Sequence, residues 1–193
     1  MFMDFFTYFV VGLAIIVSSY VLVSSDLRLS LACMAIQYLV AFLTIIQVWP
    51  IPLSAVIFIS GWMAVIVIGS LNPADIFIEK SSRSGTIFRL FSSMLVCTFV
   101  FTLSPQIKLW LPIPENFILV GFIIFGIGLL QISLSNEPIK IIIGLLTLLL
   151  GFEVIYAPLE GSALVTGVLA AIHLSIAIVG SILASQPNSG ETI

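Results

Sequence analysis

The sequence predicts an all-α integral membrane protein with about seven transmembrane helices, an N-terminus outside and a C-terminus in the cytoplasm. Of the 193 residues, 61% are hydrophobic and only 8% are charged, whereas soluble domains usually carry about 25% charged residues. Seven apolar runs approach the roughly 20 residues that cross a bilayer core as a helix. With so few charges the chain cannot cover a water-facing surface, and no stretch remains for a large soluble domain.

Prolines and polar clusters separate the seven runs. Proline cannot donate a hydrogen bond within a helix and disfavours helix in the residue before it, so Pro50, Pro105 and Pro158 indicate helix ends. The first run lacks a basic leader and a clear cleavage site, and we interpret it as a retained span. The predicted spans are residues 5–24, 29–48, 52–71, 86–104, 117–134, 139–157 and 162–185.

These spans divide the chain into five segments. Two segments of three helices flank a central part that holds a loop and one further helix. The segments are an N-terminal membrane segment at 1–71, a polar cytoplasmic loop at 72–85, the fourth helix with an outer loop at 86–116, a second three-helix membrane segment at 117–185 and a cytoplasmic tail at 186–193.

The basic residues predict the orientation, because cytoplasmic loops carry an excess of Lys and Arg. With seven spans, one side of the membrane receives five basic residues and the other receives only Lys108. The richer side is therefore expected to be cytoplasmic, with the protein in the cell (inner) membrane. Its five basic residues are Arg28, Lys80, Arg83, Arg89 and Lys140.

Two ionisable residues are expected at membrane depth. His173, the only histidine, lies close to the middle of the last span, and Glu153 lies about one turn from the outer end of the sixth. Their depths differ by roughly 10 Å, which predicts that the two side chains do not touch. Because ionisable groups inside a membrane are costly and mark functional sites, both are candidate proton-relay residues, connected through water if they act together.

The helix face around His173 is rich in small residues. Positions three, four and seven apart share a face of a helix, and this face contains Thr166, Ala177 and Gly180. Small residues let membrane helices approach closely. His173 is therefore predicted to point into protein, with Thr166 and Gly180 at the helix contact.

In the sixth span, Gly144 and Gly151 form a second close-packing stripe. Glu153 falls on roughly the opposite face of the same helix.

Simpler interpretations stay open for both ionisable residues. His173 is also compatible with a neutral ring bonded to a carbonyl or hydroxyl. Glu153 is also compatible with a carboxylate that reaches the outer headgroups, or with a protonated acid bonded to a neighbour.

Three glutamines lie within the predicted spans. Gln37 and Gln47 belong to the second predicted span and Gln131 to the fifth. They could line a hydrated path between the ionisable residues. Hydrogen bonds between helices are the alternative explanation for such amides.

Two motifs in the last three spans resemble a known family. The first is Ile143-Gly144-Leu145-Leu146, and the second is Leu169-Ala170-Ala171-Ile172-His173-Leu174-Ser175-Ile176-Ala177. They are similar to the I-G-L-E and L-A-A-A-E-A-S-I-G motifs of the three-helix K subunit of complex I, and of its relatives in group 4 hydrogenases and multisubunit cation/proton antiporters. The chain's greater length, and the stretch that begins at Ser24-Ser25-Asp26, resemble the longer membrane component E of hydrogenase-4-type complexes.

The chain departs from this family at both acidic positions. The first carboxylate of the K subunit falls at Leu146, and that of component E falls at about Leu149. Glu153 lies on the same face, one to two turns further out. His173 occupies the second carboxylate position. The resemblance implies a lateral proton path through these positions, which is either altered in this chain or lost with only the packing retained.

The function expected from these features is that of a non-catalytic membrane subunit in a complex I-like, hydrogenase-like or antiporter-like assembly. His173 and Glu153 would contribute protonatable groups to ion translocation, and the other membrane subunits and the bilayer would be its partners. A purely structural scaffold and an independent small transporter are the alternatives. No motif for nucleotide, metal or nucleic-acid binding is present, so no cofactor, metal or nucleic acid is expected.

A shift of 111 residues aligns two parts of the sequence. It places Ser24-Ser25-Asp26 on Ser135-Asn136-Glu137, and Gly69-Ser70 on Gly180-Ser181. Trp62 then falls opposite His173. Identities between these points are sparse, so the pattern raises an internal duplication as a hypothesis only.

Overall fold

The computed structural model describes residues 2–70 and 83–185 and is all-helical over them. Each of the seven helices in this part of the chain is long and apolar enough to cross a membrane, which confirms the predicted fold class. The orientation of the termini stays a prediction. The helices are α1 (Phe2–Val23), α2 (Leu27–Ile45), α3 (Ile51–Gly69), α4 (Arg83–Trp110), α5 (Glu115–Ser133), α6 (Pro138–Tyr156) and α7 (Ala163–Ser185).

Most helix ends lie within a few residues of the predicted ones. Asp26 precedes α2 as its N-cap, and its carboxylate accepts a hydrogen bond of 2.9 Å from the backbone N–H of Arg28. Pro50 precedes α3, and Pro138 is the first residue of α6, where a missing N–H costs nothing. Most of the predicted loop at 72–85 and the tail at 186–193 fall outside the described residues.

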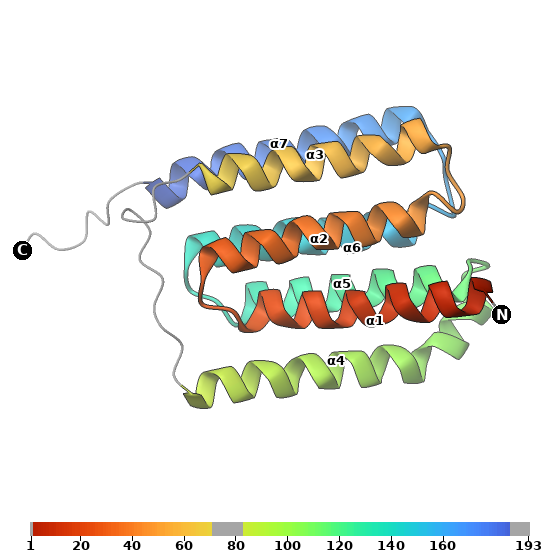
Figure 1. The fold of residues 1–193 in the computed structure, drawn as a ribbon, viewed down its shortest axis with the longest axis horizontal. Coiled ribbons are helices and arrows are strands. Elements are labelled where there is room, and N and C mark those ends of the chain that lie inside the picture. Colours follow the sequence, from red (N-terminus) through yellow and green to blue (C-terminus); the bar gives the residue numbers. More distant parts are fainter. Residues whose placement is uncertain (1, 71–82, 186–193) are drawn as a thin grey trace, which may run out of the picture.

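Helix α4 corrects the predicted end of the fourth span. Instead of ending at Ser104-Pro105, the helix continues through Pro105 to Trp110. Proline inside a helix removes one backbone hydrogen bond and bends the axis, but does not force the helix to end. Figure 1 shows the change of direction near the C-terminal end of α4.

The helices form two layers of three, with α4 beside them. Figure 1 shows α1, α2 and α3 in one layer and α5, α6 and α7 behind it in the same order. Across the layers α1 packs on α5, α2 on α6, and α3 on α7. Adding 111 to the bounds of α2, Leu27–Ile45, gives the bounds of α6, Pro138–Tyr156. The sequence shift therefore relates helices that occupy equivalent places in the two layers.

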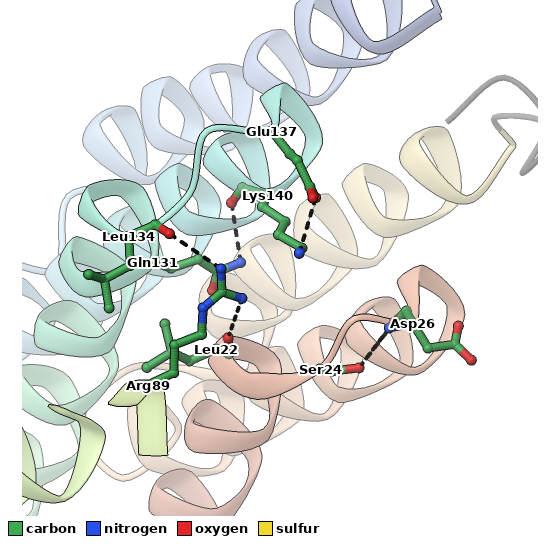
Figure 2. A network of polar contacts seen from close by, with 8 residues as sticks. All are labelled: Leu22, Ser24, Asp26, Arg89, Gln131, Leu134, Glu137 and Lys140. Atoms are coloured by element: carbon green, nitrogen blue, oxygen red, sulfur yellow. Dashed lines mark hydrogen bonds and ion pairs between the residues drawn. The ribbon is translucent and has the colours of Figure 1, made fainter. Parts of the chain in front are cut away.

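Arg89 of α4 joins the two layers at one end of the bundle (Figure 2). Its half-buried guanidinium donates hydrogen bonds to the carbonyl oxygens of Leu22, at 3.4 Å, and of Leu134, at 3.3 Å. These carbonyls belong to the C-terminal ends of α1 and α5, where the helix dipole is negative. From the sequence, Arg89 was assigned only to the more basic side of the membrane. In the structure its side chain holds two helix ends together.

Helices α5 and α6 make the closest contact in the fold. A Cβ atom added at Gly151 would overlap the backbone of Phe125, and one added at Gly128 would lie 2.8 Å from the Cα atom of Leu148. Close backbone approach of this kind stabilises membrane helices through dispersion, since lipid provides no hydrophobic drive between them. The backbones of α5 and α6 are therefore in direct contact at these glycines.

Replacing Gly151 with alanine should therefore destabilise the protein. Overpacking of a tight contact costs about 1–3 kcal/mol, which should appear as a lower thermal unfolding midpoint of the detergent-solubilised protein. Gly167→Ala in α7 is the matched control, because a Cβ atom there meets nothing within 4 Å. Equal midpoints for the two variants would contradict the close contact between α5 and α6.

Candidate proton-relay site

His173 lies near the middle of α7 on the face that the other helices cover. Its side chain is fully buried, and Thr166, Leu169, Ala177 and Gly180 on the same face are buried as well. The small residues bring α7 close to α6, since a Cβ atom added at Gly180 would lie 2.6 Å from the Ile142 side chain. The ring therefore faces protein along its whole edge, with no access to lipid.

Glu153 lies in the last turn of α6 and is also buried, with 1% of the residue exposed. The expectation that its carboxylate could reach the outer headgroups is therefore wrong. Gly144 and Gly151 turn one side of α6 toward α5, and Glu153 projects from roughly the opposite side. The packing of α5 on α6 thus directs the carboxyl group toward α7.

The prediction that Glu153 and His173 do not touch is also wrong. The Oε1 atom of Glu153 lies 3.4 Å from the Nδ1 atom of His173. Side chains on an α-helix lean toward its N-terminus, and α6 and α7 run in opposite directions. The carboxyl group therefore leans away from the turn between these helices, and the ring leans toward that turn. The two meet although their backbone positions differ in depth.

The hydrogen bond of the His173 ring identifies which nitrogen carries a proton. Nδ1 lies 3.1 Å from the carbonyl oxygen of Leu169, one turn earlier in α7. A carbonyl oxygen only accepts, so Nδ1 donates to it. In the neutral ring Nε2 then carries a lone pair, and it has no hydrogen-bond partner within the described part of the chain. Nε2 is therefore free to take up a proton.

Tyr38 of α2 is the third polar group at the site. Its ring meets the His173 ring edge to face, with centroids 5.5 Å apart and an interplanar angle of 67°. The residue is fully buried, and its hydroxyl group has no hydrogen-bond partner among residues 2–70 and 83–185. Gly61 of α3 makes room for it, because a Cβ atom there would overlap the Tyr38 ring.

Tyr38 was not identified from the sequence. An aromatic residue in an apolar helix normally indicates core packing. The hydroxyl group of a single tyrosine adds no pattern to the sequence that would distinguish it. The one sequence feature beside it is Gln37, which places two polar groups next to each other near the middle of α2. Only the fold shows that Tyr38 faces His173, because the two helices are separated by more than a hundred residues of sequence.

Glu153 and His173 form one acid–base unit. A lone carboxylate or a lone imidazolium is costly in a medium that cannot solvate it. With one proton between them the pair is electrically neutral, either as carboxylic acid and imidazole or as carboxylate and imidazolium. Because Nδ1, the ring atom nearest Glu153, already donates to Leu169, a proton that leaves the carboxyl group for the ring must end on Nε2, which gives carboxylate and imidazolium without a change in net charge. The Nε2 atom of His173 and both carboxyl oxygens of Glu153 have no hydrogen-bond partner in the described part of the chain.

No family model, curated protein or solved structure matches this chain. The resemblance to the K subunit of complex I therefore stays a prediction. The chemistry of the site is inferred from the chain's own residues.

The three glutamines do not form a continuous path to the pair. The amide of Gln37 donates to Ser18 Oγ of α1 at 2.8 Å, and the amide of Gln131 donates to the carbonyl oxygen of Lys140 at 3.2 Å. Both are hydrogen bonds between helices, as the alternative explanation expected. Gln47 is exposed in the turn after α2 and accepts from Asn116 at 3.0 Å. The side-chain oxygen Oε1 of Gln37 and that of Gln131 are buried without a partner in the described chain.

Thr166 acts locally. Its hydroxyl group donates to the carbonyl oxygen of Ser162, one turn back in α7, at 3.0 Å. His173 lies two turns further along the same face, so the hydroxyl group supports the helix start and not the ring. Within the described ranges, no group of three or more His, Cys, Asp or Glu side chains is placed to hold a metal ion.

Energetic coupling between Glu153 and His173 should be measurable. Glu153→Leu and His173→Leu should each lower the free energy of unfolding, and the double variant should lose less than the sum of the two. Groups in direct contact typically show a coupling of about 0.5–3 kcal/mol. The quantity to measure is the unfolding free energy of all four proteins in mixed detergent micelles.

Lys108 and Glu115 provide the matched control, since their charged atoms are also 3.4 Å apart but both side chains are more than half exposed. Solvent screening should hold their coupling to about 0–1 kcal/mol. Strict additivity at Glu153 and His173 would contradict the direct contact.

Proposed function

We propose that this chain is a membrane subunit that contributes the Glu153–His173 pair to proton transfer within a larger ion-translocating assembly, in the cell (inner) membrane. The observation that carries the proposal is the contact of two titratable side chains sealed inside the bundle. The sequence resemblance to complex I-like, hydrogenase-like and antiporter-like membrane subunits supports the kind of assembly. Within that assembly the chain would not catalyse a reaction by itself.

The first layer of helices supplies an internal comparison. Subtracting 111 from Glu153 and His173 gives Phe42 and Trp62, on α2 and α3. These two residues are connected by Phe58, with ring centroids 5.4 Å from Phe42 and 4.9 Å from Trp62. Trp62 is 44% exposed, so the related positions of the first layer hold an aromatic cluster at the surface of the bundle, whereas Glu153 and His173 are buried.

An ionisable pair is a costly way to fill such a place. Replacing a buried ion pair by well-packed apolar residues is often neutral or stabilising, by about 1–4 kcal/mol. A protein that only needed packing between α6 and α7 would be at least as stable with apolar side chains at these two positions. This cost supports a role in which the pair gains and loses a proton.

The shape of the helices supports a subunit more than an independent transporter. Transporters of that kind place their sites between interrupted helices, whose free ends coordinate the substrate near the midplane. Here α6 and α7 run without interruption past Glu153 and His173. In such a subunit the proton partners of the pair would belong to a neighbouring chain, and the polar groups beside the pair without a partner in the described chain are the Tyr38 hydroxyl group and the Nε2 atom of His173.

A scaffold is the second candidate, favoured by the close contact between α5 and α6. The backbone overlap that a Cβ atom would create at Gly151 shows how closely α5 and α6 approach each other. A subunit that only seals and spaces its neighbours would need this close packing and no titratable pair.

Substitution of the pair separates these functions. In the native assembly, purified through a tag on this chain, Glu153→Gln should lower the rate of proton translocation by about tenfold or more, since loss of a positioned proton-transfer group typically costs at least that much. His173→Leu should have a similar effect. The amounts of co-purifying subunits should not change, because both replacements keep the helix packing.

Lys108→Gln, which removes an exposed cation outside the pair, should leave translocation unchanged. An intact assembly that translocates protons at the normal rate with Glu153→Gln would discard the relay and leave the scaffold.

A further inference from the structure

A groove between α2 and α3 opens to the membrane at the end of the bundle that carries Arg28. It encloses about 310 Å³, within the lower range of small-molecule sites. Small side chains keep it open, since Ala32 and Ala35 line one wall and Gly69 lines the other. The groove is lined by Leu27, Arg28, Leu31, Ala32, Ala35, Val65 and Gly69.

The groove has a closed end inside the membrane. Along α2 its lining stops at Ala35, and along α3 it stops at Val65. In the next turn of α3, the indole N–H of Trp62 donates to the carbonyl oxygen of Ala35 at 3.2 Å. From Leu27 to Ala35 the helix rises about 12 Å, close to the roughly 15 Å of hydrocarbon in one leaflet. The groove is therefore as deep as a single leaflet.

The open end carries an exposed positive charge. Arg28 lies in the first turn of α2, and its guanidinium has no ion-pair partner within residues 2–70 and 83–185. The nearby carboxylate of Asp26 is engaged by the backbone N–H of Arg28 as the helix cap. At the level of the headgroups, an arginine fork is suited to the oxygens of a phosphate group.

We propose that this groove binds one anionic phospholipid of the adjacent leaflet, which the charge bias predicts to be the cytoplasmic one. An acyl chain lies between α2 and α3 and ends below Trp62, and the phosphate group contacts Arg28. The apolar lining and the arginine at the open end favour a lipid, in which an acyl chain and a phosphate group belong to one molecule. The proposal does not depend on the proton-relay function.

Lipid retention by the full-length protein tests this site. The protein is purified in neutral detergent, depleted of lipid and incubated with phosphatidylglycerol or with phosphatidylcholine of the same acyl chains. Native mass spectrometry then counts the lipids that stay bound. The wild type should retain one phosphatidylglycerol in preference to phosphatidylcholine. Arg28→Gln should lower that retention about fivefold, the value of one basic residue near a membrane surface, and Arg28→Lys should restore part of it.

Two further variants separate the groove from general surface charge. Ala32→Phe should displace the lipid by filling the groove, while Arg83→Gln, at the exposed start of α4, should leave retention unchanged. If Ala32→Phe fails to fold, the comparison of Arg28→Gln with Arg83→Gln still shows whether the lipid binds at Arg28. Equal losses from the two arginine variants would overturn the proposal. So would equal retention of both lipids, or a second copy of the chain in place of a lipid.

Discussion

The rest of the structure depends on the buried contact between a carboxyl group on α6 and an imidazole ring on α7, 3.4 Å apart. Neither group can be left alone in a medium without water, so each depends on the other and on the walls that enclose them. The α5–α6 contact aims the carboxyl group, small residues on α7 bring the ring close, and α2 and α3 close the remaining side with Tyr38 over Gly61. Five of the helices thus have a direct part in holding the pair.

The two layers of helices have the same arrangement but differ in where they carry ionisable groups. Each layer contains three helices in the same order, and equivalent helices pack on each other across the interface. At the positions related by the 111-residue shift, the first layer has a partly exposed aromatic cluster around Phe58 and the second has the buried Glu153 and His173. Arg89 joins the C-terminal ends of α1 and α5, so the layers are also connected at one end of the bundle. The duplication hypothesis gains support from this arrangement.

Hydropathy and helix periodicity were sufficient for the spans and for the inward face of His173, because both depend on local sequence. The contact with Glu153 was missed since depth was judged from the rise of the backbone, while the lean of side chains toward helix N-termini closes the gap. Pro105 misled for a related reason. Proline disfavours helix locally, but in the membrane the remaining backbone hydrogen bonds of α4 have no alternative partner, so the helix continues past Pro105. Tyr38 could not be predicted at all, since its role depends on a contact between distant helices.

The central claim is that Glu153 and His173 share a proton as one unit, and the ring itself can report on it. His173 is the only histidine of the chain, so isotope-labelled histidine gives one set of imidazole nitrogen signals in magnetic-resonance spectra of the membrane-embedded protein. If the proton is shared, Glu153→Gln should change the shifts of these nitrogens and their dependence on pH, while Glu115→Gln at the exposed pair should leave them unaltered. Identical spectra and titration curves for the wild type and Glu153→Gln would contradict the shared proton.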